Sequence, residues 1–415
     1  MVQTLETLDD NAIFDVVIVG AGMVGASAAL GISALGLSVL LVDTFAFKNT
    51  GLSYTPSYDA RSTAISWGSR EILNQLGVWS TVSEHASSIS HVHVSEKGRF
   101  GVTRMSAEEL KFDALGYVVP NQWLGQCLLK KLEDKQVPLC APAKVTRITT
   151  ENEYQLIHLE SLGVLPAVTK CIHARLTIIA DGTCSSTAEL LGIESEIEAY
   201  GQHALIANVT TALPNGGVAY ERFTTKGPLA LLPLTATTSA LVWTHDSESV
   251  QTYLDMDDKA FCTALQDAFG ERLGSITRCG ARNAYPLRLV RAKEQFRPGV
   301  VLLGNAAHSL HPVAGQGFNL ALRGVASCLE MLKQAEQAQH NIGEIGRLKR
   351  FSEGLASDQA KTVIFSDQVV KLFGHHSTLV GLVRDVGLIA LDNFPMLKSV
   401  FASQAMGLAG KKARF

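Results

Sequence analysis

Three glycines near the N-terminus are spaced so as to hold a phosphate-bearing ligand. Gly20, Gly22 and Gly25 form the pattern G-x-G-x-x-G. Gly20 would permit a tight turn, Gly22 would let a pyrophosphate approach the backbone, and Gly25 would let the following helix pack closely on a strand. Asp43 follows 18 residues after Gly25, where a carboxylate would accept hydrogen bonds from an adenosine ribose. We therefore expect a dinucleotide site here.

The elements around these glycines are the ones that such a site needs. The β-branched residues 16–19 predict a buried strand, residues 26–35 predict a helix that Gly36 ends, and residues 38–42 predict a second buried strand. Residues 16–42 carry no charge, so length alone would also fit a membrane-spanning helix. The glycine turn inside the run favours the strand–turn–helix–strand unit. FAD and NAD share its geometry, and the pattern does not choose between them.

Two further predicted strands end in turns that contain glycine, and another glycine turn opens a helix. The residues of these turns are Asp181 and Gly182, Gly304 and Asn305, and Gly315, Gln316 and Gly317. A turn that opens a helix presents backbone N–H groups at the positive end of the helix dipole. The pyrimidine edge of a flavin becomes anionic on reduction and suits that position. A second G-x-G-x-x-G unit and a C-x-x-C pair are absent from the sequence, which excludes the flavoprotein disulfide reductases.

The order of these signals resembles that of the FAD-dependent aromatic hydroxylases, the group A flavoprotein monooxygenases. That family carries G-x-G-x-x-G, then D-G, then G-D-A-A-H-x-x-x-P, and the corresponding residues here span about 15–320. Within the family, the chain is most similar to the ubiquinone-biosynthesis hydroxylases. The stretches that carry this closer similarity are residues 58–64, 91–95, 221–223, 227–234 and 304–320.

The resemblance implies an α/β fold like that of para-hydroxybenzoate hydroxylase. A Rossmann-like FAD-binding domain would carry an inserted substrate-side β-sheet domain and a C-terminal helical region. The expected bounds are 12–75, 120–190 and 280–330 for the discontinuous FAD-binding domain, 76–119 and 191–279 for the substrate domain, and 331–415 for the helical region.

The resemblance also implies which residues contact FAD. The set is Gly20, Gly22 and Gly25 at the ADP part, Asp43 at the ribose, Arg61, Gln126, Asp181 and Gly182 around the pyrophosphate and the flavin, Asn305 at the ribityl chain, and Gly315, Gln316 and Gly317 at the flavin ring. Two positions depart from the family. Asn305 replaces the usual aspartate, so it can bond a hydroxyl without supplying charge. Ala188 replaces an arginine that often follows the D-G motif.

The implied reaction hydroxylates an aromatic ring. Reduced flavin would react with O2 to give a hydroperoxide, and an electron-rich phenol would attack its distal oxygen. In the resembled group, 2-polyprenyl-6-methoxyphenol becomes the 1,4-benzoquinol, with NAD(P)H as the reductant. Alternatives are a sibling hydroxylase that acts at another ring carbon and a non-catalytic FAD-binding assembly subunit. The catalytic base is not identified by the pattern; His308 and Tyr285 are candidates, each with a structural role as the alternative.

A polyprenyl substrate requires a long apolar groove. Candidates for its lining are Phe223, Leu231, Leu234, Trp243 and Phe318, for each of which core packing is the alternative. Residues 379–391 form a strongly apolar predicted helix, followed by basic residues at the C-terminus. This helix either packs on its own domain or a second subunit, or attaches the protein to the inner face of a membrane or to a lipid-presenting partner, such as another ubiquinone-biosynthesis protein.

Composition bears on whether the protein binds nucleic acid, binds a metal or is secreted. The 36 basic and 39 acidic residues give a net charge of −3, which does not favour a nucleic-acid partner. Seven cysteines without a C-x-x-C pair indicate reduced thiols and no zinc site, and His91 and His93 lack a third ligand nearby. Residues 1–10 contain no basic residue, unlike a secretory signal. We therefore expect a cytoplasmic protein without a bound metal.

Overall fold

The computed structural model describes residues 2–47, 61–163, 165–309, 315–374, 378–394, 398–399, 401–403 and 406–408. Residues 58–60 of the stretch 58–64, residues 310–314 of the stretch 304–320 and the basic residues at 411–414 lie outside this range.

The first sheet contains the predicted strand–turn–helix–strand unit. That unit is β2 (Ile13–Val19), α1 (Met23–Ala34) and β3 (Val39–Val42), and β2 and β3 pair in parallel. The strand order is β1-β9-β3-β2-β12-β11-β10, with β20 beside β12 and β19 beside β20. The other bounds are β1 (Val2–Gln3), β9 (Leu139–Cys140), β10 (Ala143–Glu151), β11 (Tyr154–Ser161), β12 (Thr169–Ile179), β19 (Phe296–Arg297) and β20 (Val300–Leu302).

The two faces of this sheet are buried against different elements. Val16 and Ile18 pack under a helical layer formed by α1, α4 (Asn121–Asp134), α8 (Gln316–Gln337) and α9 (Ile345–Gly374). Val17 and Val19, which alternate with them along β2, pack among residues of β10 to β12 and the 3-10 helix η1 (Leu5–Thr7). Burial on both faces explains why residues 16–19 of β2 form an unbroken apolar run.

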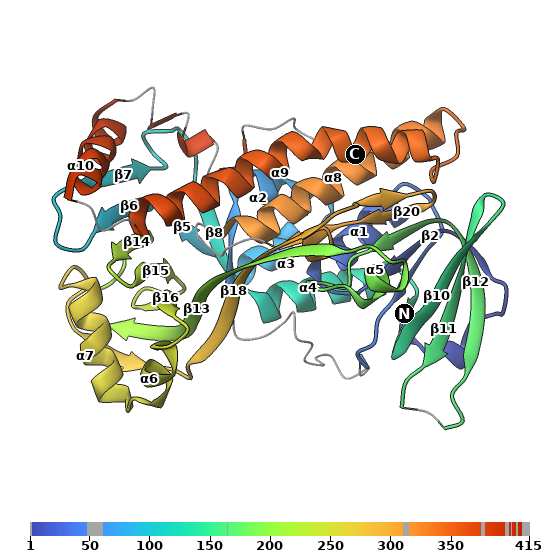
Figure 1. Ribbon diagram of the computed structural model, residues 1–415, viewed down its shortest axis with the longest axis horizontal. Coiled ribbons are helices and arrows are strands. Elements are labelled where there is room, and N and C mark those ends of the chain that lie inside the picture. The colour runs from blue at the N-terminus through green and yellow to red at the C-terminus, as the bar shows by residue number, and fades with distance from the viewer. Residues whose placement is uncertain are drawn as a thin grey trace.

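The second sheet is mainly antiparallel. Its order is β21-β18-β13-β16-β15-β14-β6-β7, with β17 beside β13, and the long strands β13 and β18 lead from it towards the first sheet (Figure 1). The bounds are β6 (His91–Glu96), β7 (Val102–Ser106), β13 (Ser195–Thr211), β14 (Val218–Thr224), β15 (Gly227–Pro233), β16 (Thr238–Asp246), β17 (Ile276–Cys279), β18 (Asn283–Ala292) and β21 (His308–Ser309). α6 (Val250–Asp255) and α7 (Asp258–Phe269) cover one of its faces.

Smaller elements complete the described chain. A short sheet has the order β4-β8-β5, with bounds Ser62–Ser66, Gly116–Pro120 and Ser87–Ile89. The remaining helices are α2 (Trp67–Gln75), α3 (Trp79–Val82), η3 (Ser83–His85), α5 (Ser186–Leu190), η4 (Gly304–Ala306) and α10 (Thr378–Asn393). In Figure 1, α10 lies beside β7 at the end of the molecule that holds the second sheet.

The expected domain bounds differ from the sheets at β18 and at the short β21 that pairs with it. β18 falls in the segment 280–330 that was expected in the FAD-binding domain, yet it pairs along its length with β13 of the second sheet. In β18 the buried Leu287 and Leu289 alternate with the exposed Arg288, which is typical of an antiparallel strand with one solvated face. The rest of the division stays a prediction.

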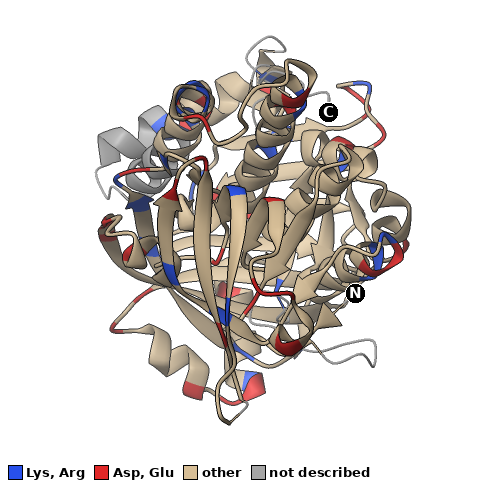
Figure 2. Ribbon diagram, turned by 90° about the vertical axis from the view of Figure 1, so that its right-hand side faces the viewer, with Lys and Arg blue, Asp and Glu red and all other residues tan. Residues whose placement is uncertain are grey.

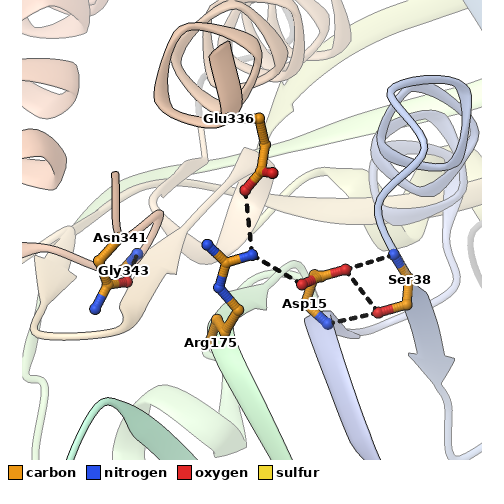
Figure 3. Close-up of polar contacts among 6 residues, drawn as sticks. All are labelled: Asp15, Ser38, Arg175, Glu336, Asn341 and Gly343. Carbon is orange, nitrogen blue, oxygen red and sulfur yellow. Dashed lines mark hydrogen bonds and ion pairs between the residues drawn. The ribbon is translucent and has the colours of Figure 1, made fainter. Parts of the chain in front are cut away.

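A polar cluster fixes the amino ends of the central strands (Figure 3). Asp15 in β2 accepts hydrogen bonds from the N–H and the hydroxyl of Ser38, both at 2.8 Å. Arg175 in β12 donates to Asp15 at 2.9 Å and also pairs with Glu336 near the end of α8, at 3.1 Å. The cluster joins β2, β12, α8 and the segment before β3. It leaves the carboxyl ends of the strands for the site.

Candidate active site in the cavity between the two sheets

A cavity of about 1380 Å³ lies between the carboxyl ends of β2, β3 and β12 and one face of the second sheet. Single-ligand pockets commonly measure about 300–1,000 Å³, so this cavity has room for a dinucleotide and a second molecule together. Its wall contains residues of both sheets, of the N-terminal turns of α1 and α8, and of α10.

The first glycine turn is shaped by close backbone contacts. Gly20 has a φ of +101°, and a Cβ on it would lie 2.5 Å from the carbonyl oxygen of Ala180. Gly25 lies outside the cavity wall, where a Cβ would meet the carbonyl oxygen of Gly20 at 1.9 Å; it therefore serves close packing, as its spacing predicted. Gly22 is the N-cap of α1, without a side-chain cap and without an acid in the first turn. The N-terminus of α1 thus faces the cavity with its N–H groups available.

Asp43 lies at the end of β3 and ties the glycine turn to that strand. One carboxylate oxygen accepts from the N–H of Ala21 at 2.6 Å, and the other accepts from the N–H of Phe45 at 2.9 Å. Burial raises the pKa of Asp43, against these hydrogen bonds, which lower it. The carboxylate also lines the cavity, so its remaining lone pairs are available to a ribose.

Asp181 and Gly182 follow β12 at the neighbouring strand end. Oδ2 of Asp181 accepts from the N–H of Thr187 at 3.2 Å, whereas its buried Oδ1 has no hydrogen-bond partner among the described residues. Gly182 has a φ of +97°, a conformation that few other residues adopt. A buried acceptor without a donor, in a cavity wall, fits a ligand that supplies the donor.

The turns around α8 complete this side of the cavity. Asn305 lies in η4 and lines the cavity, as do Gly315, Gln316, Gly317 and Phe318. Gly315 is a left-handed N-cap of α8, which has neither a side-chain cap nor an acid in its first turn. As at α1, an uncapped positive helix end faces the cavity.

Asn319 holds the α8 turn in place, a role that the sequence analysis did not assign. Its carboxamide oxygen accepts from the N–H of Ser66 at 2.9 Å, and its NH2 donates to the carbonyls of Ala64 and Gly315, both at 2.8 Å. The available signal was a polar side chain at the start of a largely apolar helix.

Arg61 and Tyr285 lie together in the cavity wall. The Arg61 guanidinium stands over the Tyr285 ring at 4.7 Å from its centroid, a cation–π contact that joins the short sheet to β18. Gln126 does not line the cavity. Its helix contributes Asn121 instead, which accepts a hydrogen bond from the Thr63 hydroxyl at 2.6 Å.

The second sheet presents a mostly apolar face to the cavity. Phe223 belongs to this face, whereas Leu231 and Trp243 point to the opposite face and pack in the core under α7. Leu234 does not line the cavity either; it packs in an apolar cluster of which other members, such as Met105 and Leu232, do line it. The prediction that Leu231, Leu234 and Trp243 line the groove is therefore wrong. Their neighbours along the strands line it instead, among them Ala230, Leu232 and Val242.

Glu221 is a carboxyl group on this apolar face, and the sequence analysis gave it no role. It lines the cavity, and burial raises its pKa to about 7. From sequence, the signal was an acidic residue within a strand whose alternate positions are apolar.

α10 closes one end of the cavity and packs on its own chain. The hydroxyl of Thr103 donates to the carbonyl of Leu388 at 2.7 Å, and the buried Asp385 accepts from the N–H of Gly101 at 3.1 Å. Arg384 pairs with Glu96 at 2.9 Å. Arg384, Leu388 and Leu391 also line the cavity, which sequence reasoning did not foresee.

His308 does not reach the cavity. It is buried beside a separate small void that is lined by residues such as Leu355 and Gln359. Burial lowers its pKa to about 4, so the ring is neutral near pH 7. The described residues contain no group of side chains that could hold a metal ion, and no described helix is long and apolar enough to cross a bilayer.

Comparison with known proteins decides the family. Residues 14–340 match a family model described as FAD binding domain. Ubiquinone hydroxylase UbiL of Rhodospirillum rubrum is 31% identical over 96% of this chain and 90% of its own length. The chain belongs to the FAD-dependent aromatic monooxygenases. This monooxygenase is also 29% identical to 3-demethoxyubiquinol 3-hydroxylase of Escherichia coli, over 95% of the chain and 98% of that protein.

The fold of the monooxygenase agrees with solved structures. The p-nitrophenol 4-monooxygenase PnpA of Pseudomonas putida DLL-E4 superposes with a TM-score of 0.76 at 15% identity, over 97% of this chain and 99% of that one. The cofactor of the monooxygenase is FAD. The cavity fits this cofactor, because two uncapped helix N-termini and the unpartnered Oδ1 of Asp181 face the same space.

Proposed function

We propose that the protein hydroxylates the aromatic ring of a polyprenylphenol in ubiquinone biosynthesis. The observation that carries this proposal is the continuity of one cavity. It joins the glycine turns at the strand ends to an apolar sheet face and then to Leu388 and Leu391 of α10. A ring placed between the turns and the sheet would leave a prenyl chain an apolar path.

The residues that would hold FAD follow from the wall of the cavity. Gly22 and the N-terminus of α1 would bind the pyrophosphate, Asp43 the ribose, and Asn305 the ribityl chain. Arg61, Asp181 and Gly182 would lie near the pyrophosphate, and the α8 turn with Gly315, Gln316 and Gly317 would face the flavin ring. Gly25 supports the turn from behind. Gln126, like Gly25, lies outside the wall, so no contact with FAD is proposed for it.

Bound FAD would accept electrons from NAD(P)H and, once reduced, activate O2. The chain's own part is positioning and protection. The uncapped end of α8 favours an anionic ring edge, because the helix dipole is positive there. The apolar sheet face excludes water from the reacting ring, which limits unproductive loss of the activated oxygen. Tyr285, held under Arg61, would lie at the edge of the ring site.

The proposed product is the 1,4-benzoquinol of 2-polyprenyl-6-methoxyphenol, with the new hydroxyl para to the first. Hydroxylation at another ring carbon is the nearest alternative, since one relative is named as a 3-hydroxylase. A panel of short-chain prenylphenols with different free ring positions separates the two. We expect product only from phenols with an open para position. Product from a para-blocked phenol would favour the alternative.

Turnover also distinguishes an enzyme from an FAD-binding assembly subunit. We expect NAD(P)H oxidation by the holoenzyme to accelerate when a short-chain 2-prenyl-6-methoxyphenol is added. An FAD-loaded protein whose NAD(P)H oxidation responds to no phenol would contradict the proposed function and favour the assembly role. Attachment to a membrane surface and self-association remain predictions, and sedimentation of the full chain with liposomes tests the first.

A further inference from the structure

Glu221 lies on β14, on the cavity face of the second sheet. Strand register places it directly opposite Ala230 of β15 on one side and Val94 of β6 on the other. Along β14, the residues on the same face are Ala219 and Phe223, two positions away in each direction. All four nearest neighbours on this face are therefore apolar. The two alanines leave space beside the carboxyl group for a flat ring.

Charges on the surrounding elements are engaged elsewhere. On α10, Arg384 pairs with Glu96 of β6, and Asp385 bonds Gly101 and Arg99. On β14 itself, Arg222 points to the opposite face, where it donates to the carbonyl of Ala268. β15 and β16 contribute no charged side chain to the wall, and from β18 Tyr285 is the titratable group. The Glu221 side chain is half-buried in the wall, and no hydrogen bond or ion pair of it is found within the described part of the chain.

A carboxyl group in such a place costs stability unless a ligand satisfies it. Desolvation is the whole cause of its raised pKa of about 7, so near neutral pH the group exists in both the acid and the carboxylate form. A general base is most effective when its pKa lies near the working pH. The position thus combines a carboxyl group without a partner among the described residues, a suitable pKa and room for a ring.

Resting on the function proposed above, we propose that Glu221 binds the phenolic hydroxyl of the substrate and accepts its proton. In this step the phenol O–H bond breaks, a new O–H bond forms on the Glu221 carboxylate, and the electron pair stays on the phenolate oxygen. No oxidant or reductant takes part. The phenolate is more electron-rich than the phenol at its para carbon, the carbon that the proposed reaction attacks.

The test uses the FAD-loaded full chain and two probes, a short-chain 2-prenyl-6-methoxyphenol and its O-methyl ether. Binding of each is followed by the change in flavin absorbance between pH 6 and pH 8.5. A hydrogen bond to an ionised acceptor is about twice as strong as a neutral one. The wild type should therefore prefer the phenol over the ether by about tenfold at pH 8.5, and less at pH 6, where Glu221 is protonated. In Glu221→Gln the preference should be smaller and independent of pH.

Turnover provides the second readout. The wild-type rate with the phenol should fall as pH drops below about 7, whereas Glu221→Gln should lose about 100-fold or more and show no such inflection. Glu221→Asp should keep an inflection at a lower rate. Glu198→Gln, an exposed residue of β13 in the same sheet, is the matched control and should behave as wild type.

The outcomes separate this inference from the proposed function. If wild type hydroxylates the phenol and Glu221→Gln keeps its rate and pH profile, the role of Glu221 is overturned while the function stands. If wild type hydroxylates no phenol, the proposed function itself fails. Should Glu221→Gln not retain FAD, the pH dependence of the phenol preference in wild type and Glu221→Asp decides; a preference that is constant with pH in both overturns the inference.

Discussion

At the scale of the residue, Gly20 shows how one missing side chain forms the site. Gly20 has a φ of +101°, and a Cβ on it would lie 2.5 Å from the carbonyl oxygen of Ala180. An alanine at this position would therefore strain the turn and push it away from the end of β12. We expect Gly20→Ala to bind FAD at least about tenfold more weakly, since strain of this kind costs about 1–3 kcal/mol. Titration of the apoprotein with FAD measures this.

Gly354→Ala is the matched control for that substitution. Gly354 lies in α9, and an added Cβ there would meet no atom within 4 Å. Its FAD affinity should equal that of wild type. Equal affinities for Gly20→Ala and wild type would contradict the role assigned to the turn.

The raised pKa of Glu221 predicts that the free energy of unfolding falls as pH rises. A carboxyl group in an ion pair would have the opposite effect. Its folded pKa of about 7 exceeds its ordinary value of 4.5, so the unfolded chain loses this proton first as pH rises. The free energy of unfolding therefore falls as pH rises through the window between these values. Glu221→Gln removes the penalty. Its apparent melting temperature should match wild type at pH 4.5 and exceed it by about 2 °C at pH 8; a lower value at pH 8 would contradict the desolvation of Glu221.

The positions where a turn needs glycine could be predicted from the sequence, whereas the spatial neighbours of a side chain could not. Gly20 was predicted from the tight turn of the glycine pattern, and Gly182 and Gly315 from the family resemblance; all three have positive φ and lie in the cavity wall. Glu221 and Asn319 gave no comparable signal. Their roles depend on neighbours that are distant in sequence, such as Val94 opposite Glu221.

At the scale of the element, the Asp15 cluster sets how β2, β12 and α8 lie relative to one another (Figure 3). Burial alone would raise the pKa of Asp15, but hydrogen bonds from Arg175 and Ser38 together hold it below its usual value. Asp15→Asn should lower the free energy of unfolding by about 1–3 kcal/mol at pH 7. The exposed Asp9→Asn is the control and should have no effect.

The pH dependence of that loss is fixed by the direction of the shift. A carboxyl group with a lowered folded pKa stabilises the protein above its unfolded pKa, and this stabilisation is lost as pH falls through the folded value. The difference between wild type and Asp15→Asn in denaturant unfolding should therefore shrink below about pH 4. A difference that stays constant down to pH 3 would show that the ion pair is not its source.

We expect α10 to contribute to substrate binding and not to FAD binding. Asp385→Ala would leave the N–H of Gly101 without its acceptor, would remove one of the two acidic partners of Arg99, and would loosen α10 from β7. We expect the KM for a prenylated phenol to rise about tenfold, with FAD content unchanged, because Leu388 and Leu391 would leave the wall. Asp267→Ala, at an exposed position of α7, is the control. Loss of FAD in Asp385→Ala alone would contradict this division.

The strands were easier to predict than the side of the sheet to which each of their side chains points. The runs at 16–19 and 38–42 were predicted as strands because both of their faces are apolar, and both strands are confirmed. The same property hides direction in residues 229–234, where nearly every side chain is apolar. Which of Leu231 and Leu232 faces the cavity depends on pairing with β14 and β16, and Leu232 is the one that does.

At the scale of the whole molecule, two sheets of different character enclose one cavity. The first is built around parallel strands and ends in the glycine turns that line the cavity, and the second offers an apolar face with Glu221. Lys and Arg are interspersed with Asp and Glu over the elements seen in Figure 2, in keeping with the net charge of −3. Contacts such as Thr103 with Leu388 join segments hundreds of residues apart, which sequence spacing alone does not reveal.

The central claim is that FAD in this cavity places an oxygen atom from O2 on the ring of a phenol. The most direct measurement incubates the FAD-loaded protein with NAD(P)H, ¹⁸O2 and a short-chain 2-prenyl-6-methoxyphenol, and analyses the product by mass spectrometry. We predict a quinol that carries one ¹⁸O atom, bonded para to the original hydroxyl. A product without the label, or a protein that takes up FAD and converts no phenol, would contradict the account.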